Sequence, residues 1–265
     1  MLPTFYLFGR QIGLFAVLVI VGSLVAGTWA CYVARRRGYD DNPTIIVLLF
    51  VALGAFIGGF LLYGLLNVHM LLEVISDSNT GEFNQLWVAL RVVFGGTVFF
   101  GGLVGGLIGG VICIYKMDLP FREYSDMLVP AIPLFHIFGR IGCFLAGCCY
   151  GIESNLGFTI RNSLVASANN VRRLPIQLIE SLINAFLFLL LASMLKRRKG
   201  KGMLLLIYIV LYSSIRFMLE FGRGDTARGI IFGMSTSQFI SLILLLVCIS
   251  YIAVSKGLSA KLKSS

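Results

Sequence analysis

Charged residues are scarce in this sequence. Only 13% of its 265 residues are Asp, Glu, Lys or Arg, whereas 58% are hydrophobic, and the mean hydropathy is +0.91. A soluble domain of this length could not bury so much apolar surface. The composition therefore predicts an all-α polytopic membrane protein, with one integral membrane domain over residues 1–265.

Histidine and cysteine are also sparse, with two and six residues respectively. Neither histidine joins the cysteines in a known zinc-ligand spacing and there is no CxxC motif, so we expect no metal and no cofactor. All six cysteines lie in or beside apolar spans, which disfavours a disulfide framework. Three are expected to pack as small apolar residues: Cys31, Cys113 and Cys248. Whether the other three react or merely pack stays open: Cys143, Cys148 and Cys149.

Seven stretches are apolar enough to form transmembrane helices. The first nine residues carry no basic group and no A-x-A-like site closes the first stretch, so we expect it to be retained. Residues 67–85 read as an external loop, 86–93 as an interfacial segment, 116–123 as a short turn and 151–174 as a small external cap. Pro130 and Pro133 predict a kink or break in the fourth span. The expected spans are 12–34, 44–66, 94–115, 127–150, 175–195, 203–221 and 237–255.

Basic residues set the expected orientation. The net charge of +10 comes largely from clusters beside apolar spans, a membrane pattern that does not indicate nucleic-acid binding. Thirteen Lys and Arg residues fall on the side where odd-numbered spans exit, against seven on the other. The positive-inside rule then places the N-terminus outside and the C-terminus in the cytoplasm, in a multi-pass protein.

The fourth span contains ionisable residues at membrane depth. His136, Arg140 and Cys143 stand at i, i+4 and i+7, so they share one helical face. Gly139 and Gly142 permit close approach of a helix or a lipid headgroup. A charge at this depth costs about 3 kcal/mol or more unless it has a partner, a cavity or an anionic ligand. We therefore expect a functional site here.

A second charged stripe lies on the sixth span, where Arg216, Glu220 and Arg223 also stand at i, i+4 and i+7. Arginines converging at lipid depth suit a phosphate, because guanidinium binds phosphate oxygens in pairs. Gln177 and Glu180, near the outer end of the fifth span, are candidates for binding headgroup hydroxyls. These positions favour a site for a phospholipid that enters between helices.

Four motifs together resemble the bacterial prolipoprotein diacylglyceryl transferase family. They are Gly139-Arg140-Ile141-Gly142, the segment from Leu174 to Glu180, Arg216-x-x-x-Glu220-Phe221-x-Arg223-x-Asp225, and Ser235-Thr236-Ser237-Gln238. Their order and spacing agree over nearly the whole chain. The resemblance also implies location in the bacterial plasma membrane.

The resemblance implies transfer of diacylglycerol from phosphatidylglycerol to the lipobox cysteine thiol of a prolipoprotein signal peptide, with release of glycerol phosphate. By motif, Arg140 would hold the lipid phosphate, Arg216 would offset charge on the leaving phosphate and Glu220 would orient Arg216. Substrate-binding roles would fall to Gly139, Gly142, Cys143, Gln177, Glu180 and Arg223.

The chain departs from the family where thiol activation is concerned. Cys143 and Cys148 replace the family's Asn and Glu, and Phe100 replaces its His. His136 is a hypothetical replacement base; a hydrogen-bonded core histidine is the alternative. A relative with another acceptor, a non-catalytic phospholipid-binding protein and a transporter also stay open, although no internal repeat supports the last.

Overall fold

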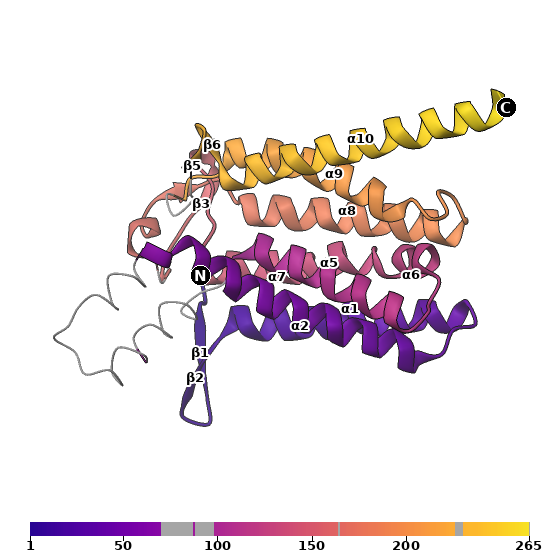
Figure 1. Cartoon of the computed structure of the whole chain (residues 1–265). Helices are drawn as coiled ribbons and strands as arrows, with labels where there is room; N and C mark the ends of the chain where they lie inside the picture. The colour runs from indigo at the N-terminus through magenta and orange to yellow at the C-terminus, as the bar shows by residue number, and fades with distance from the viewer. Residues whose placement is uncertain (70–86, 88–97, 164, 226–229, 265) are drawn as a thin grey trace. The chain divides into compact units, whose positions relative to one another are not determined.

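The structure, a computed structural model, describes residues 1–69, 87, 98–163, 165–225 and 230–264 (Figure 1). The chain divides into two compact units. The first joins Met1–Ala30 to Ser125–Ser265, and the second is Cys31–Tyr124. The expectation of one domain over 1–265 stays a prediction.

The expected helical membrane architecture is confirmed. Within the described residues, six segments are long and apolar enough to cross a membrane, and Gly101–Lys116 is a shorter apolar helix. These seven segments correspond to the seven expected spans. Residues 94–97 of the third span, 70–85 of the expected loop, and 86 and 88–93 of the interfacial segment lie outside the described residues. The six longer segments are Leu14–Arg36, Asp41–Leu66, Phe121–Ala146, Ile176–Lys196, Leu204–Gly222 and Thr236–Val254.

The second unit is built on α2 (Asp41–Leu66) and α5 (Phe99–Lys116), which pack along a seam of glycines. A Cβ placed on Gly105 would overlap the carbonyl oxygen of Gly54, and one on Gly101 would overlap that of Gly58. Only residues without a Cβ allow backbones to approach this closely. The glycines of α5 that recur every four residues therefore form a packing seam with α2.

A β-hairpin that was not predicted from the sequence opens the first unit. Strands β1 (Thr4–Leu7) and β2 (Arg10–Gly13) pair antiparallel, with Leu7 opposite Arg10. Phe8 and Gly9 both have positive φ, as tight two-residue hairpins require. Helix α1 (Leu14–Arg36) follows, so the first helix begins two residues later than expected.

The fourth span is broken as its prolines predict. Helix α6 (Phe121–Leu128) ends before Pro130, and α7 (Ala131–Ala146) begins after it. The expected turn over 116–123 is too long at its far end, because α6 already begins at Phe121. The expected helix end at residue 150 is also wrong. Gly147 takes a left-handed conformation, φ 73°, and terminates α7.

Helices α8 (Ile176–Lys196), α9 (Leu204–Leu219) and α10 (Thr236–Ser264) complete the first unit. In this unit α8 packs against both α7 and α9, and α9 packs against α10 (Figure 1). At the start of α9, the Asp126 carboxylate accepts hydrogen bonds from the backbone N–H groups of Gly202 and Leu204.

Short strands and turns lie between the helices at the other end of the unit. In the expected cap, β3 (Glu153–Thr159) pairs with β4 (Arg172–Arg173), and Ala166–Ala168 forms a 3₁₀ turn. A second 3₁₀ turn, Glu220–Gly222, ends α9. The hairpin of β5 (Ile230–Ile231) and β6 (Met234–Ser235) precedes α10.

Candidate active site

A buried network of two arginines and two carboxylates joins α7, α8 and α9. Glu180 bridges both arginines: its Oε1 lies 2.9 Å from Arg140 Nη2, and its Oε2 lies 3.4 Å from Arg216 Nη1. Arg216 Nη2 pairs in turn with Glu220 Oε2 at 2.9 Å. The four formal charges cancel, which is how ionised groups are tolerated at this depth.

Arg140 is the most accessible member of this network. Its side chain is 13% exposed, whereas the side chains of Arg216, Glu180 and Glu220 are at most 4% exposed. A guanidinium carries five N–H donors, and the ion pair with Glu180 joins only one nitrogen, Nη2. Arg140 is therefore the member best placed to meet an anionic ligand.

Arg216 is held on a further side by α10. Its Nη2 donates a hydrogen bond to Ser237 Oγ at 3.1 Å. No role was predicted for Ser237 from the sequence, although it lies in the motif Ser235–Gln238. The bond joins α9 to the start of α10 and fixes the orientation of the guanidinium.

His136 lies on the same helix as Arg140, one turn earlier, and is buried. Its ring centroid is 5.5 Å from that of Tyr212, and the side chain of Asn184 lies beside it. Asn184 also donates to the carbonyl of Glu180 at 2.8 Å. The polar surroundings suit both hypotheses for His136, the base and the core histidine.

The two glycines of the central motif have different surroundings. A Cβ on Gly139 would meet nothing within 4 Å, so the backbone here is open to a ligand. A Cβ on Gly142 would lie 3.0 Å from the ring of Phe15 on α1. Gly142 therefore serves helix packing in the structure, and its substrate-binding role stays a prediction.

Arg223 does not continue the stripe that was predicted on the sixth span. Helix α9 ends at Leu219, the chain tightens into the 3₁₀ turn, and Arg223 is extended at φ −87°, ψ 138°. Its Nε and Nη2 pair with Asp225 Oδ1 and Oδ2 at 3.0 and 2.6 Å. Arg223 also forms an antiparallel bridge with Gly151, which places it beside the first residues of the cap.

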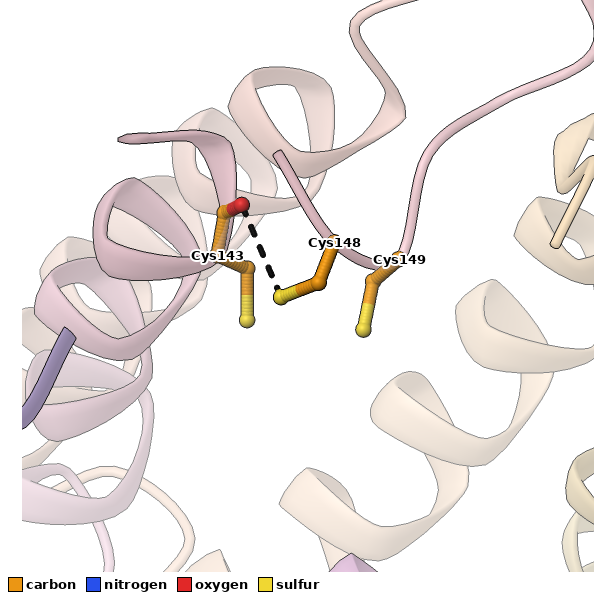
Figure 2. Close-up of side chains that lie close together, drawn as sticks. All are labelled: Cys143, Cys148 and Cys149. Atoms are coloured by element: carbon orange, nitrogen blue, oxygen red, sulfur yellow. Dashed lines mark hydrogen bonds between the residues drawn. The ribbon is translucent and has the colours of Figure 1, made fainter. Parts of the chain in front are cut away.

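Three cysteines gather where α7 ends, Cys143 on its last turn and Cys148 and Cys149 on the turn that follows (Figure 2). The Sγ atoms of Cys143, Cys148 and Cys149 all lie within 4.8 Å of one another. Cys148 N–H donates to the Cys143 carbonyl at 3.1 Å, and Cys148 Sγ lies 3.7 Å from the same oxygen. Gln177 Nε2 donates to the Cys148 carbonyl at 2.7 Å, which ties the turn to α8 one turn before Glu180.

Charges around the turn act on groups outside the spanning helices. Hydrogen bonds from the Cys143 and Cys148 thiols, with the nearby positive charges of Arg223 and Arg140, lower the pKa of Cys149 despite its burial. Burial opposes the charge on Arg223, but the hydrogen bonds that it donates to Asp225 and the neighbouring negative groups outweigh this effect, so the pKa of Arg223 is raised. Both effects favour charged forms at this end of the unit.

A cavity of about 420 Å³ opens beside Glu220, between the end of α9 and the start of α10. This volume is in the range of small-molecule sites. Its lining comes from the 3₁₀ turn that ends α9, the residues that follow it, the β5–β6 hairpin and the first turn of α10: Glu220, Phe221, Gly224, Asp225, Ile230, Gly233, Met234, Ser235 and Gln238.

These features define a multi-pass helical membrane protein with a charge-balanced site buried among its helices at one end of the first unit. A family model described as prolipoprotein diacylglyceryl transferase matches residues 3–254. The chain belongs to the prolipoprotein diacylglyceryl transferase family. The resemblance noted from the four motifs is thereby confirmed.

Several bacterial relatives carry the name phosphatidylglycerol–prolipoprotein diacylglyceryl transferase. The protein of Clostridium tetani is 30% identical over 248 residues, which cover 92% of this chain and 93% of that protein. The Clostridium perfringens protein, which carries this name with the number 2, is 32% identical over 243 residues, which cover 91% of this chain and 87% of that protein. The Campylobacter lari protein is 30% identical over 255 residues, with 92% and 89% covered.

Proposed function

We propose that this chain transfers diacylglycerol from phosphatidylglycerol to the thiol of the lipobox cysteine in a prolipoprotein signal peptide. The thiolate sulfur attacks the glyceryl carbon, the carbon–oxygen bond breaks, and glycerol phosphate leaves with the electron pair. The observation that carries the proposal is the network in which Glu180 bridges Arg140 and Arg216. Family membership supports it independently.

In this proposal Arg140 holds the lipid phosphate, because it is the most exposed cation of the network. Arg216 offsets the charge that builds up on the departing phosphate, and Glu220 orients Arg216 through their 2.9 Å pair. Glu180 fixes the spacing of the two guanidinium groups. A pre-formed arrangement of this kind costs no reorganisation when the leaving group develops its charge.

The surrounding residues complete the site. Gln177 positions the turn after α7, Gly139 leaves room for the headgroup, and Arg223 with Asp225 closes the outer end. We place this end on the outer face of a bacterial plasma membrane, with the N-terminus outside and the C-terminus cytoplasmic. The excess of basic residues on the opposite side supports that orientation.

The test uses purified full-length protein in phosphatidylglycerol vesicles with a lipobox peptide. We expect thioether formation on the peptide and equal release of glycerol phosphate, both lost in Arg140→Ala. Arg161→Ala is the matched control, since Arg161 is an exposed arginine on the cap. Release without peptide lipidation would show a different acceptor. Lipidation that persists in Arg140→Ala would refute the assigned phosphate site.

A further inference from the structure

We propose that Cys143, Cys148 and Cys149 form a three-thiolate site for a thiophilic divalent cation, with Zn²⁺ the candidate, and that its open fourth position takes the acceptor thiol. The first part rests on the geometry of the turn alone. The second part rests on the proposed transferase function.

The positions of the sulfur atoms suit a metal ion. Zinc–sulfur bonds are about 2.3 Å long, so three sulfurs around one ion lie about 4 Å apart. The three Sγ atoms already lie within 4.8 Å of one another and point into the same space (Figure 2). Closing on an ion therefore requires shifts of less than about 1 Å, which side-chain rotation supplies.

The backbone of the turn is built to hold this arrangement. Gly147 and Cys149 both have positive φ, 73° and 54°, and such a conformation in a non-glycine residue is strained. Neighbouring groups fix the turn at two carbonyls: Ser163 Oγ donates to Gly147 at 3.0 Å, and Gln177 donates to Cys148. This conformation directs the Cys149 side chain towards the two other thiols, and the two hydrogen bonds offset its energetic cost.

Charge balance favours thiolates at this place. Three thiolates around a divalent cation leave one net negative charge. Arg140 lies three residues before Cys143, on the same side of α7. Arg223 bridges Gly151, two residues after Cys149. Two guanidinium groups therefore lie near the cluster, and each is also paired with a carboxylate, Arg140 with Glu180 and Arg223 with Asp225.

A disulfide fits the three thiols less well. Cys148 and Cys149 are adjacent, and adjacent Cα atoms lie about 3.8 Å apart, below the usual disulfide range. Pairing Cys143 with either partner would leave one thiol over. A metal site uses all three. We expected no metal from the sequence, because the spacing of these cysteines matches no common ligand motif. The left-handed conformation of Gly147 turns the chain back and brings the three thiols together.

Zinc sites with three protein ligands keep one position for water or substrate. An acceptor thiol that binds there loses its proton to water and becomes a thiolate, the nucleophilic form. Its sulfur then forms the bond to the glyceryl carbon while glycerol phosphate leaves. The resulting thioether departs and restores the three-thiolate site. Cys143 and Cys148 replace the family's Asn and Glu. The metal would therefore supply the activation of the acceptor thiol that those two residues no longer provide.

The binding test titrates Cd²⁺ into reduced, metal-stripped full-length protein and follows the ultraviolet thiolate-to-cadmium band. We expect saturation at one ion per chain and competition by Zn²⁺. Replacing Cys143, Cys148 and Cys149 together by Ser should abolish the band. The matched control, Cys31→Ala, Cys113→Ala and Cys248→Ala together, should retain it. Circular dichroism and elution volume verify that both variants fold. A band that is absent from the native chain, or that survives in the Ser variant, overturns the site.

The activity test compares peptide lipidation by stripped protein with and without added Zn²⁺. Loss on stripping and recovery with Zn²⁺ supports the activating role. Metal binding with lipidation unaffected by stripping overturns that role and leaves the transferase proposal intact. Metal binding without lipidation under any condition supports the site and overturns the transferase proposal instead.

Discussion

Glu180→Gln should be among the most destabilising substitutions in the chain. The side chain of Glu180 is 2% exposed and contacts both Arg140 and Arg216, so the substitution leaves two guanidinium groups to share Glu220. Removing one partner from a buried ion pair costs about 3–5 kcal/mol, because the remaining charge is uncompensated. We expect a loss of this size in the free energy of unfolding.

Arg140→Gln should cost less than Glu180→Gln. Glu180 then keeps Arg216 at 3.4 Å, and Arg140 is the most exposed of the four side chains. The double variant retains the 2.9 Å pair of Arg216 and Glu220, which is balanced by itself. Its cost should therefore fall below the sum of the two single costs, by about 0.5–3 kcal/mol for residues in one network.

The assay is reversible unfolding in mixed micelles, with Arg161→Gln as the exposed control. Both variants of the network should also lose lipidation, so activity does not distinguish them and stability must be measured. If the loss of stability in the Arg140→Gln/Glu180→Gln double variant equals the sum of the two single losses to within about 0.5 kcal/mol, the bridging role of Glu180 is refuted.

Three further predictions concern other parts of the molecule. Gly105→Leu should force α2 and α5 apart and destabilise the protein by about 1–3 kcal/mol or more in thermal unfolding, whereas Gly13→Ala, which meets nothing within 4 Å, should be neutral. The hydrogen bond from Tyr39 to Glu123 raises the pKa of Tyr39 from 10.0 to about 12. The stabilisation that this bond gives the folded protein is therefore complete below pH 10 and is lost as the pH rises to 12. The difference in unfolding temperature between native chain and Tyr39→Phe should vanish over that interval; a constant difference would contradict it. Gln177→Leu should leave the carbonyl of the cysteine turn unpaired and cost about 1–3 kcal/mol, measured by unfolding; an unchanged stability would count against that tie.

Much of the fold follows from patterns that are local in the sequence. Apolar runs located the helices, and Pro130 located the break in the fourth span. Each of these signals acts through the physics of a single helix or pair of helices. The same is true of the face shared by His136 and Arg140.

The helix ends were harder to predict, because periodicity says nothing about where a helix stops. We extended the helical spacing i, i+4, i+7 past Leu219, which placed Arg223 on the same stripe as Arg216. The 3₁₀ turn interrupts that stripe. Extending the fourth span to residue 150 overlooked Gly147, although a glycine after an apolar run is a usual stop signal. That oversight also hid the cysteine cluster.

The partners of the charged groups depend on tertiary packing. The sequence predicts Glu180 as a headgroup ligand, which stays a prediction, but it did not reveal that Glu180 bridges Arg140 and Arg216 from the neighbouring helices. Nothing in the spacing of residues 140, 180 and 216 specifies that pairing. The contact of Ser237 with Arg216 likewise appears only once α9 and α10 lie together.

The cysteine turn and the arginine network differ in how far apart their members lie along the chain. The three thiols span seven residues, and the turn's own backbone bond from Cys148 to Cys143 closes it. Such short loops close at little entropic cost, whereas residues 140–220 must await the docking of three helices. The backbone of the cysteine turn can therefore close with the end of α7, whereas the bonds from Gln177 and Ser163 that hold it form only when α8 and the cap dock.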